Sequence, residues 1–257
     1  MLSIQPIEAF SDNYIWLICR ESDNQAFVVD PGDPQVVEQA LAARDLKLAG
    51  ILITHHHFDH VGGLAALKAA HDPVVYGPVN PAIEGIDHRV GDGDRVDVLG
   101  QSFSVMEVPG HTLDHIAYVS GGETPVLFCG DTLFAGGCGR VFEGTPQMMH
   151  KSLQALMELP GTTAVYCAHE YTLANLEFAR AVEPDNTALT QRIEDARACR
   201  ARGEPTVPSH LALERATNPF VRCETPELTA SLAAQDRLED AEPDAVFALV
   251  RGWKDNF

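Results

Sequence analysis

The chain has 257 residues, of which 45% are hydrophobic and 21% charged, and a formal net charge of −19. This is the composition of a globular protein large enough for one large domain or two unequal ones. A charge this negative argues against nucleic acid or an anionic membrane as the main partner, because binding to phosphate groups relies on Lys and Arg.

In the first two thirds of the chain, short β-rich runs are separated by turns and a few helical stretches. Because the strands are grouped rather than strictly alternating with helices, we expect two sheets with helices outside them. Strands are predicted at residues 14–18, 26–29, 51–53, 73–76, 102–108, 116–119, 126–129 and 164–167, and helices at 34–43 and 61–71.

After Tyr171 the pattern becomes helical, with no convincing strand. We therefore place a domain boundary near residue 172, which gives an α+β domain over residues 1–172 and a smaller α-helical domain over residues 173–257. The helices expected in the second domain cover residues 173–182, 187–202, 226–238 and 243–252.

The sequence contains neither a secretory signal pattern at its start nor an apolar run of the length that spans a membrane. Its six cysteines are scattered, without C-x-x-C spacing. Small buried thiols in a reducing compartment fit this pattern better than disulfides, so a cytoplasmic location is predicted.

The most informative motif is Thr-His-His-His-Phe-Asp-His at residues 54–60, directly after an apolar strand-like run. Imidazoles and a carboxylate crowded into one turn need a cation to gather them, and a divalent metal does this best. His55 and His57 are two residues apart on an extended segment, so they project to the same side, whereas Asp59 and His60 begin the next turn. This spacing indicates two metal ions rather than one.

Three further candidate ligands each follow the end of a predicted strand: His111, Asp131 and His169. Together with the motif they supply five histidines and two aspartates, a suitable set for two ions. We expect one ion on three histidines, the other on Asp59 and two histidines, and Asp131 as the bridge. In full, the first set is His55, His57 and His111, and the second is Asp59, His60 and His169. The remaining histidines are assigned structural or solvent roles.

With these residues, the chain resembles the metallo-β-lactamase superfamily, whose motif is His-x-His-x-Asp-His followed by a later His, an Asp and a final His. The resemblance covers roughly residues 1–172 and implies an αββα sandwich with a binuclear metal site along one edge. Zinc is the metal expected, and iron and manganese also accept this mixed set of nitrogen and oxygen ligands.

Further segments are similar to the glyoxalase II (hydroxyacylglutathione hydrolase) family and extend the resemblance over nearly the whole chain. It implies hydrolysis of S-D-lactoylglutathione and other S-2-hydroxyacylglutathiones to a 2-hydroxy acid and glutathione, in methylglyoxal detoxification. The segments are Asp12–Trp16, Gly130–Phe134, Gly137–Thr145, His169–Thr172 and Arg251–Phe257.

The chemistry fits the same residues. Two bound cations lower the pKa of bridging water to about 7, so a metal-bridging hydroxide is the expected nucleophile. Asp59 and Asp131 are the expected catalytic side chains, because the first orients this hydroxide and the second sets the distance between the metals. A thiolate with a reference pKa of about 8.5 leaves without a strong general acid.

The family resemblance also suggests substrate contacts. Arg251 and Lys254, three residues apart on the last helical turn, are expected to grip the glycine carboxylate of glutathione, which makes the helical domain the substrate-binding one. Arg140 takes the place of a family lysine, Tyr171 matches a family tyrosine, and Phe142 stands where some relatives carry a tyrosine. We expect a monomer whose partner is this small thioester.

Two rival functions differ in what they require of the sequence. A persulfide dioxygenase of the same superfamily needs a single iron held by two His and one Asp, which the second ligand set and the helical tail argue against. A non-catalytic metal- or glutathione-binding protein that kept the fold is expected to have lost ligands, and all seven are present.

Overall fold

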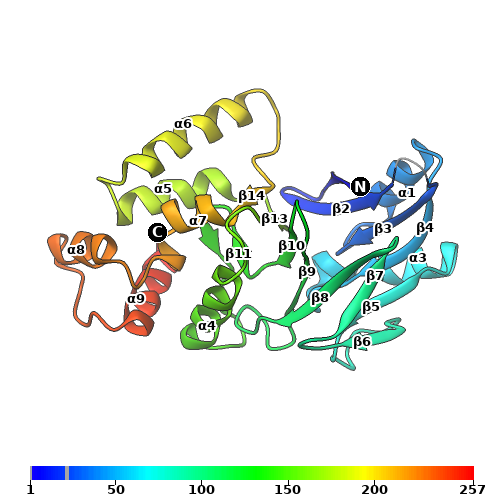
Figure 1. The fold of residues 1–257 in the computed structure, drawn as a ribbon, viewed down its shortest axis with the longest axis horizontal. Helices are drawn as coiled ribbons and strands as arrows, with labels where there is room; N and C mark the ends of the chain where they lie inside the picture. The colour runs from blue at the N-terminus through cyan, green and yellow to red at the C-terminus, as the bar shows by residue number, and fades with distance from the viewer. Residues whose placement is uncertain (1, 21–22) are drawn as a thin grey trace. The chain divides into compact units, whose positions relative to one another are not determined.

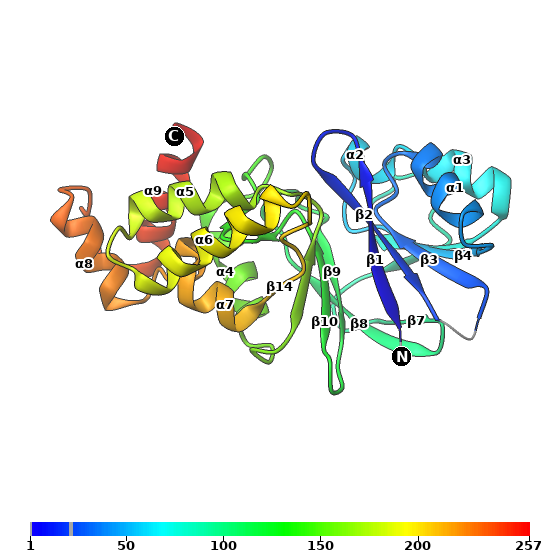
Figure 2. The same cartoon turned by 90° about the horizontal axis from the view of Figure 1, so that it is seen from above.

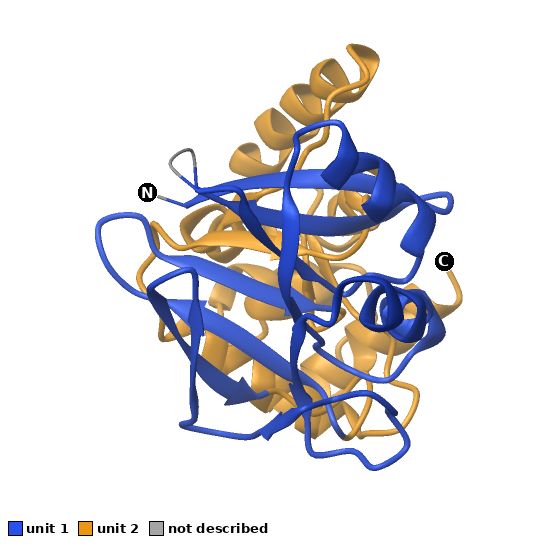
Figure 3. Ribbon diagram, turned by 90° about the vertical axis from the view of Figure 1, so that its right-hand side faces the viewer, with its two compact units in different colours: residues 1–107, 114–130 blue, residues 108–113, 131–257 orange. Residues whose placement is uncertain are grey.

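The apolar run before the histidine-rich motif forms the buried strand β4 (Lys47–Leu52) in the computed structural model, which describes residues 2–20 and 23–257. The chain divides into two compact units, coloured separately in Figure 3. Unit 1 holds the residues up to 107 together with 114–130, and unit 2 holds 108–113 and 131–257. The chain therefore passes from one unit to the other three times.

In unit 1, β4 lies inside a six-stranded sheet with the order β1-β2-β3-β4-β5-β6. Pairing is antiparallel from β1 to β3 and parallel from β3 to β6. Parallel strands covered on both faces are mostly apolar, and β4 is apolar after its exposed first residue, Lys47. The other strands are β1 (Ser3–Ala9), β2 (Asn13–Cys19), β3 (Gln25–Val29), β5 (Val74–Pro78) and β6 (His88–Val90).

Helices α1 (Pro34–Ala42) and α3 (Leu64–His71) pack their apolar residues into the core of this sheet. Helix α1 begins with Pro34 after Asp33, whose side chain accepts a hydrogen bond from the Gln35 amide, a favourable helix start. The helix predicted over residues 61–71 is present as α3 but begins later, at Leu64, and Val61 instead ends the short helix α2 (Phe58–Val61). Between them the Gly63 amide donates to the Pro31 carbonyl oxygen, an approach that glycine permits because a Cβ there would lie 2.4 Å from that oxygen.

Unit 1 also contains four antiparallel strands in the order β10-β9-β8-β7. Phe103 and Phe128 stack in their buried face, with ring centroids 5.9 Å apart. Tyr118 is also buried, and its hydroxyl donates to the Ile53 carbonyl at the end of β4. These strands are β7 (Arg95–Val98), β8 (Gln101–Glu107), β9 (Ile116–Ser120) and β10 (Val126–Gly130), labelled in Figure 1.

Unit 2 is mainly helical, as Figure 2 shows from above. Its buried rings Phe178, Phe220 and Phe247 form a chain in which each centroid lies 5.9 Å from the next. The helices are α4 (Pro146–Met157), α5 (Thr172–Val182), α6 (Thr187–Ala201), α7 (Leu211–Thr217), the 3-10 turn η1 (Pro219–Val221), α8 (Pro226–Ala234) and α9 (Pro243–Asp255). The strands are β11 (Leu133–Phe134), β12 (Gly137–Cys138), β13 (Ala164–Cys167) and β14 (Ser209–His210).

The strands predicted in the first two thirds are present, and so are the four helices predicted after residue 172. The absence of a strand in that last part is wrong, since β14 pairs with β13. Helix α4 was not predicted either, although Thr145 followed by Pro146 is a good helix start. The division at residue 172 rests on the change in sequence pattern and stays a prediction.

All six cysteines lie in described residues and are free thiols. No helix in the described ranges combines the length and the apolar character needed to cross a membrane.

Candidate metal centre

Four of the seven predicted ligands lie together in unit 1, on the loop after β4 and on the short helix α2. His55 Nε2 is 3.1 Å from His57 Nδ1, and His60 Nε2 is 3.4 Å from Asp59 Oδ2. Ligand atoms of His55 and His60 also lie within 4.8 Å of each other. His55 and His60 are fully buried, whereas His57 and Asp59 are partly exposed, so this group opens on one side.

The orientation of this first group is set by residues that the sequence analysis did not assign to the site. The Asp30 carboxylate accepts hydrogen bonds from the Thr54 amide and hydroxyl, both at 2.7 Å, and its Oδ2 lies 3.0 Å from His60 Nδ1. Because the Nδ1 side of His60 faces this carboxylate, Nε2 remains as its ligand nitrogen. On the other side, Asn13 donates to Asp59 Oδ2 at 2.9 Å.

The other three predicted ligands lie together in unit 2. His111 Nε2 is 3.4 Å from Asp131 Oδ2, and His169 Nε2 is 3.3 Å from Asp131 Oδ1. One imidazole thus faces each oxygen of a single carboxylate, as expected for a carboxylate that bridges two cations. All three side chains are at least nine-tenths buried.

The chemistry of these donors fits divalent metals. His111 Nδ1 donates to the Arg140 carbonyl oxygen at 2.7 Å, so its Nε2 presents a lone pair toward the carboxylate of Asp131. A lone pair and an anionic oxygen repel each other at this distance unless a cation binds both. Imidazole nitrogens and carboxylate oxygens are ligands that zinc, iron and manganese accept.

Two aromatic side chains lie against the imidazoles of unit 2. The Tyr171 ring stacks on His169, with centroids 4.7 Å apart and planes 5° apart, and the Phe142 ring meets His111 edge-on at 5.3 Å. Both rings are well exposed for their size, at 38% for Tyr171 and 60% for Phe142. They offer apolar surface to a ligand directly beside the metal-binding group.

The predicted cations of α9 differ in their surroundings. Arg251 is buried, donating to the Cys138 carbonyl oxygen at 3.1 Å and to Asp255 Oδ1 at 2.9 Å. Lys254 is partly exposed and donates to the Ala174 carbonyl oxygen at 3.2 Å. Burial lowers the pKa of Lys254, and the charge of Arg251 adds to this effect.

The third predicted cation, Arg140, follows β12 and is 61% exposed. Its guanidinium carbon lies 5.7 Å from the centre of the Phe142 ring. A cation and an aromatic ring therefore adjoin on the surface of unit 2.

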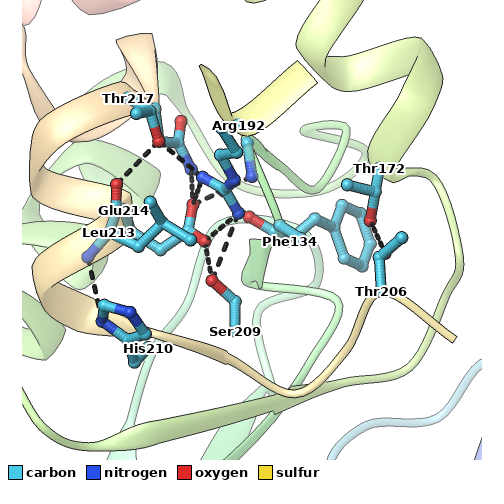
Figure 4. Close-up of polar contacts among 12 residues, drawn as sticks. Phe134, Thr172, Arg192, Thr206, Ser209, His210, Leu213, Glu214 and Thr217 are labelled. Atoms are coloured by element: carbon cyan, nitrogen blue, oxygen red, sulfur yellow. Dashed lines mark hydrogen bonds and ion pairs between the residues drawn. The ribbon is translucent and has the colours of Figure 1, made fainter. Parts of the chain in front are cut away.

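A buried network in unit 2 supports the β11–β12 hairpin, which lies in the sequence between Asp131 and Arg140 (Figure 4). Glu214 of α7 is fully buried and accepts hydrogen bonds from both terminal nitrogens of Arg192 on α6. It also accepts from the Gly136 amide in the hairpin turn at 2.9 Å. The turn that precedes Arg140 is thus fixed by two helices of the C-terminal part.

The comparisons with known proteins agree with this geometry. The model of the Metallo-beta-lactamase superfamily matches residues 10–169, so the fold class is that of this superfamily, as predicted. A second model, Hydroxyacylglutathione hydrolase C-terminus, matches residues 170–257. The chain is 52% identical to Hydroxyacylglutathione hydrolase of Pseudomonas aeruginosa (strain LESB58) and 51% identical to that of Chromohalobacter salexigens, in each case over 100% of both proteins. It therefore belongs to the hydroxyacylglutathione hydrolase family, which confirms the resemblance seen in the sequence.

Solved structures support the fold. ETHE1 from Myxococcus xanthus superimposes with a TM-score of 0.66 at 28% identity, covering 99% of this chain and 98% of that one. TTHA1623 in a di-iron-bound form has a TM-score of 0.55 at 29% identity, covering 64% of this chain and 91% of that one.

Proposed function

We infer that this protein is a glyoxalase II, which hydrolyses S-D-lactoylglutathione and related S-2-hydroxyacylglutathiones to the 2-hydroxy acid and glutathione. The observation that carries this conclusion is the match, over the full length of both proteins, to curated relatives named Hydroxyacylglutathione hydrolase. The two groups of imidazole and carboxylate side chains, which could hold metal ions, agree with this function.

The seven predicted ligands are proposed to hold two divalent ions, with Asp131 as the bridge. Contacts within unit 1 support this grouping, because they bring together the residues that precede ligands of both groups. A Cβ on Gly130 would lie 2.4 Å from Thr54 Oγ1, and the Ile116 amide donates to the Thr54 carbonyl oxygen. Asp131 follows Gly130 and His55 follows Thr54 in the sequence, which supports the proposal that the two side chains bind metal in one binuclear site.

In the proposed reaction, water adds to the thioester carbonyl carbon, and the C–S bond breaks with its electron pair on sulfur. When bound, the two cations make water acidic enough to attack near neutral pH and polarise the carbonyl. Asp59 accepts a hydrogen bond from the attacking water or hydroxide and so orients it, while Asn13 keeps the Asp59 carboxylate in place. A thiolate of reference pKa about 8.5 needs no strong acid to leave.

The substrate contacts proposed in unit 2 divide by chemistry. The exposed rings of Phe142 and Tyr171 offer apolar surface beside His111 and His169. Lys254, Arg251 and Arg140 supply positive charge for the carboxylates of glutathione, which a chain with a net charge of −19 must provide locally.

We propose zinc as the resident metal, on the basis of the mixed nitrogen and oxygen donors, although the structure of TTHA1623 is of a di-iron form. A cytoplasmic location is proposed because six free thiols suit a reducing compartment. A monomer remains the proposed state.

The decisive experiment measures S-D-lactoylglutathione hydrolysis and metal content in the same preparations. Changing Asp131 to Ala should lower the metal content below two ions per chain and the activity by at least about 100-fold, since carboxylate and charge are both lost. Asp240→Ala is the matched control, because this aspartate is exposed in the loop before α9. Full activity with two metals per chain in the Asp131 variant would show that the ligand assignment is wrong.

A further inference from the structure

The last turn of α9 contains a carboxylate that contacts two of the cations proposed to bind substrate. Asp255 Oδ1 accepts from Arg251 Nη2 at 2.9 Å and lies 3.6 Å from Arg140 Nε. The two guanidinium groups come from distant parts of the sequence, one from the loop after β12 and the other from α9. A single oxygen atom of Asp255 therefore adjoins both.

The three groups differ in their burial. The Arg251 side chain is 8% exposed, is held by the Cys138 carbonyl oxygen at 3.1 Å, and lies over the Phe220 ring at 5.0 Å. The Arg140 side chain is 61% exposed and that of Asp255 29% exposed, and Asp255 is the third residue from the end of the chain. Arg251 is therefore the buried member of the pair, whereas the Asp255 side chain already reaches solvent.

A ligand carboxylate that binds Arg251 meets a guanidinium group already paired with the Asp255 carboxylate. Arginine grips a carboxylate best with two parallel N–H groups, and Nη1 of Arg251 already donates to the Cys138 carbonyl. The ligand therefore competes with Asp255 for the charge of Arg251 and for the N–H groups of Nη2. A ligand without a carboxylate at this position leaves Asp255 in place.

We propose that Asp255 is a specificity-determining residue, an internal carboxylate that competes with the terminal carboxylate of the glutathione moiety for Arg251 and Arg140. This proposal rests on the proposed function. The free glutathione released by hydrolysis carries the same carboxylate as the thioester, so the competition weakens the binding of both. Asp255 thereby helps the product to leave.

The test uses calorimetric titration of the metal-loaded protein with two ligands that cannot be hydrolysed. One is S-hexylglutathione, and the other is the same compound with its glycine carboxylate converted to a primary amide. Asp255→Asn keeps the size of the side chain and removes its charge. Asp240→Asn is the matched control, because it makes the same change in charge at an exposed site in the loop before α9.

We expect Asp255→Asn to bind S-hexylglutathione about two to five times more tightly than the wild type, the upper part of the range for loss of one partly exposed ion pair. The amide ligand should bind both proteins equally, and Asp240→Asn should behave as wild type. Asp255→Ser, which cannot accept as an anion, should tighten binding in the same way and guards against a folding defect in one variant.

Weaker binding of S-hexylglutathione to both Asp255 variants would overturn the proposal, because Asp255 would then only hold Arg251 in position. An equal gain for the carboxylate and amide ligands would overturn it too, since the effect would be one of general charge. Failure of the proposed function would look different: the wild-type protein would bind neither ligand and would not hydrolyse S-D-lactoylglutathione.

Discussion

Replacing Glu214 by Gln should destabilise the protein strongly, although the side chain keeps its shape. Glu214 is fully buried, and its two oxygens accept from Arg192, Ser209, Asn218 and the Gly136 amide. Glutamine loses the charge that balances Arg192 and turns an NH2 group toward groups that are donors themselves.

Breaking a buried ion pair by removing one partner costs about 3–5 kcal/mol. For a chain of this size, each kcal/mol lowers the melting temperature by about 2–4 °C, so Glu214→Gln should unfold roughly 6–20 °C below the wild type. Thermal unfolding followed by circular dichroism measures this shift. The matched control is Glu204→Gln, which breaks an ion pair of the same 2.5 Å length with Arg202 on the surface and should leave the melting temperature unchanged.

The same substitution should change the response to acid. Burial by itself would raise the pKa of Glu214, but the charge of Arg192 and the hydrogen bonds outweigh it and lower the pKa below the ordinary 4.5. The ionised group therefore adds stability above pH 4.5, and this stability is lost as the pH falls through the folded-state pKa. Glu214→Gln should lack this part of the acid transition. A melting temperature equal to that of the wild type, or an equal loss in Glu204→Gln, would refute the reasoning.

Three further outcomes follow from the site. Lys254→Ala should raise KM for glutathione thioesters by about tenfold or more, the value of a charge-assisted hydrogen bond. Because burial lowers the pKa of Lys254 below its ordinary 10.5, KM of the wild type should begin to rise below that pH, and a KM that stays flat up to pH 10.5 would contradict this. Asp30→Asn should weaken metal binding by about 10–100-fold, measured in competition with a chelator. Asp45→Asn is the control, because Asp45 is exposed and also has a positive φ, and it should leave metal binding unchanged. Equal metal affinity in the two variants would count against a role for Asp30. Gly130→Ala should lower both the metal content and the stability, because its Cβ would meet the Thr54 hydroxyl. Gly93→Ala is the control: Gly93 also has a positive φ but lies in open space, so this change should lower the stability only by the backbone strain. An equal loss in both variants would refute the clash.

The candidate metal ligands stand out in the sequence because the first four form one dense motif after a strand and each of the other three follows a further strand. The side chains that orient them could not be found in this way. Asp30 belongs to an Asp-Pro-Gly-Asp stretch that indicates a turn, and nothing local shows that its carboxylate reaches Thr54 and His60. Such contacts depend on how β3 and β4 pair, which is a tertiary property.

The helical part shows the same limit at its network of buried charge. Helical spacing predicted α5, α6, α8 and α9, because each presents apolar residues with the period of a helix. It gave no reason to link Arg192 with Glu214, which are 22 residues apart on different helices. Helix α7 and the short strand β14 were not predicted, because each is brief and follows the prolines that interrupt the helical pattern.

Most of the buried arginines of unit 2 leave little free positive charge for an anionic ligand. Arg192, Arg222 and Arg251 are each paired with a carboxylate of the chain itself, so their charges are largely balanced. Lys254 instead donates to a backbone carbonyl, and burial already disfavours its charged form. A ligand carboxylate therefore stabilises Lys254 more than it stabilises a paired arginine. On the proposed function, the positive potential for glutathione therefore depends on Lys254, on the exposed Arg140 and on how readily Asp255 gives up Arg251, rather than on the number of basic residues.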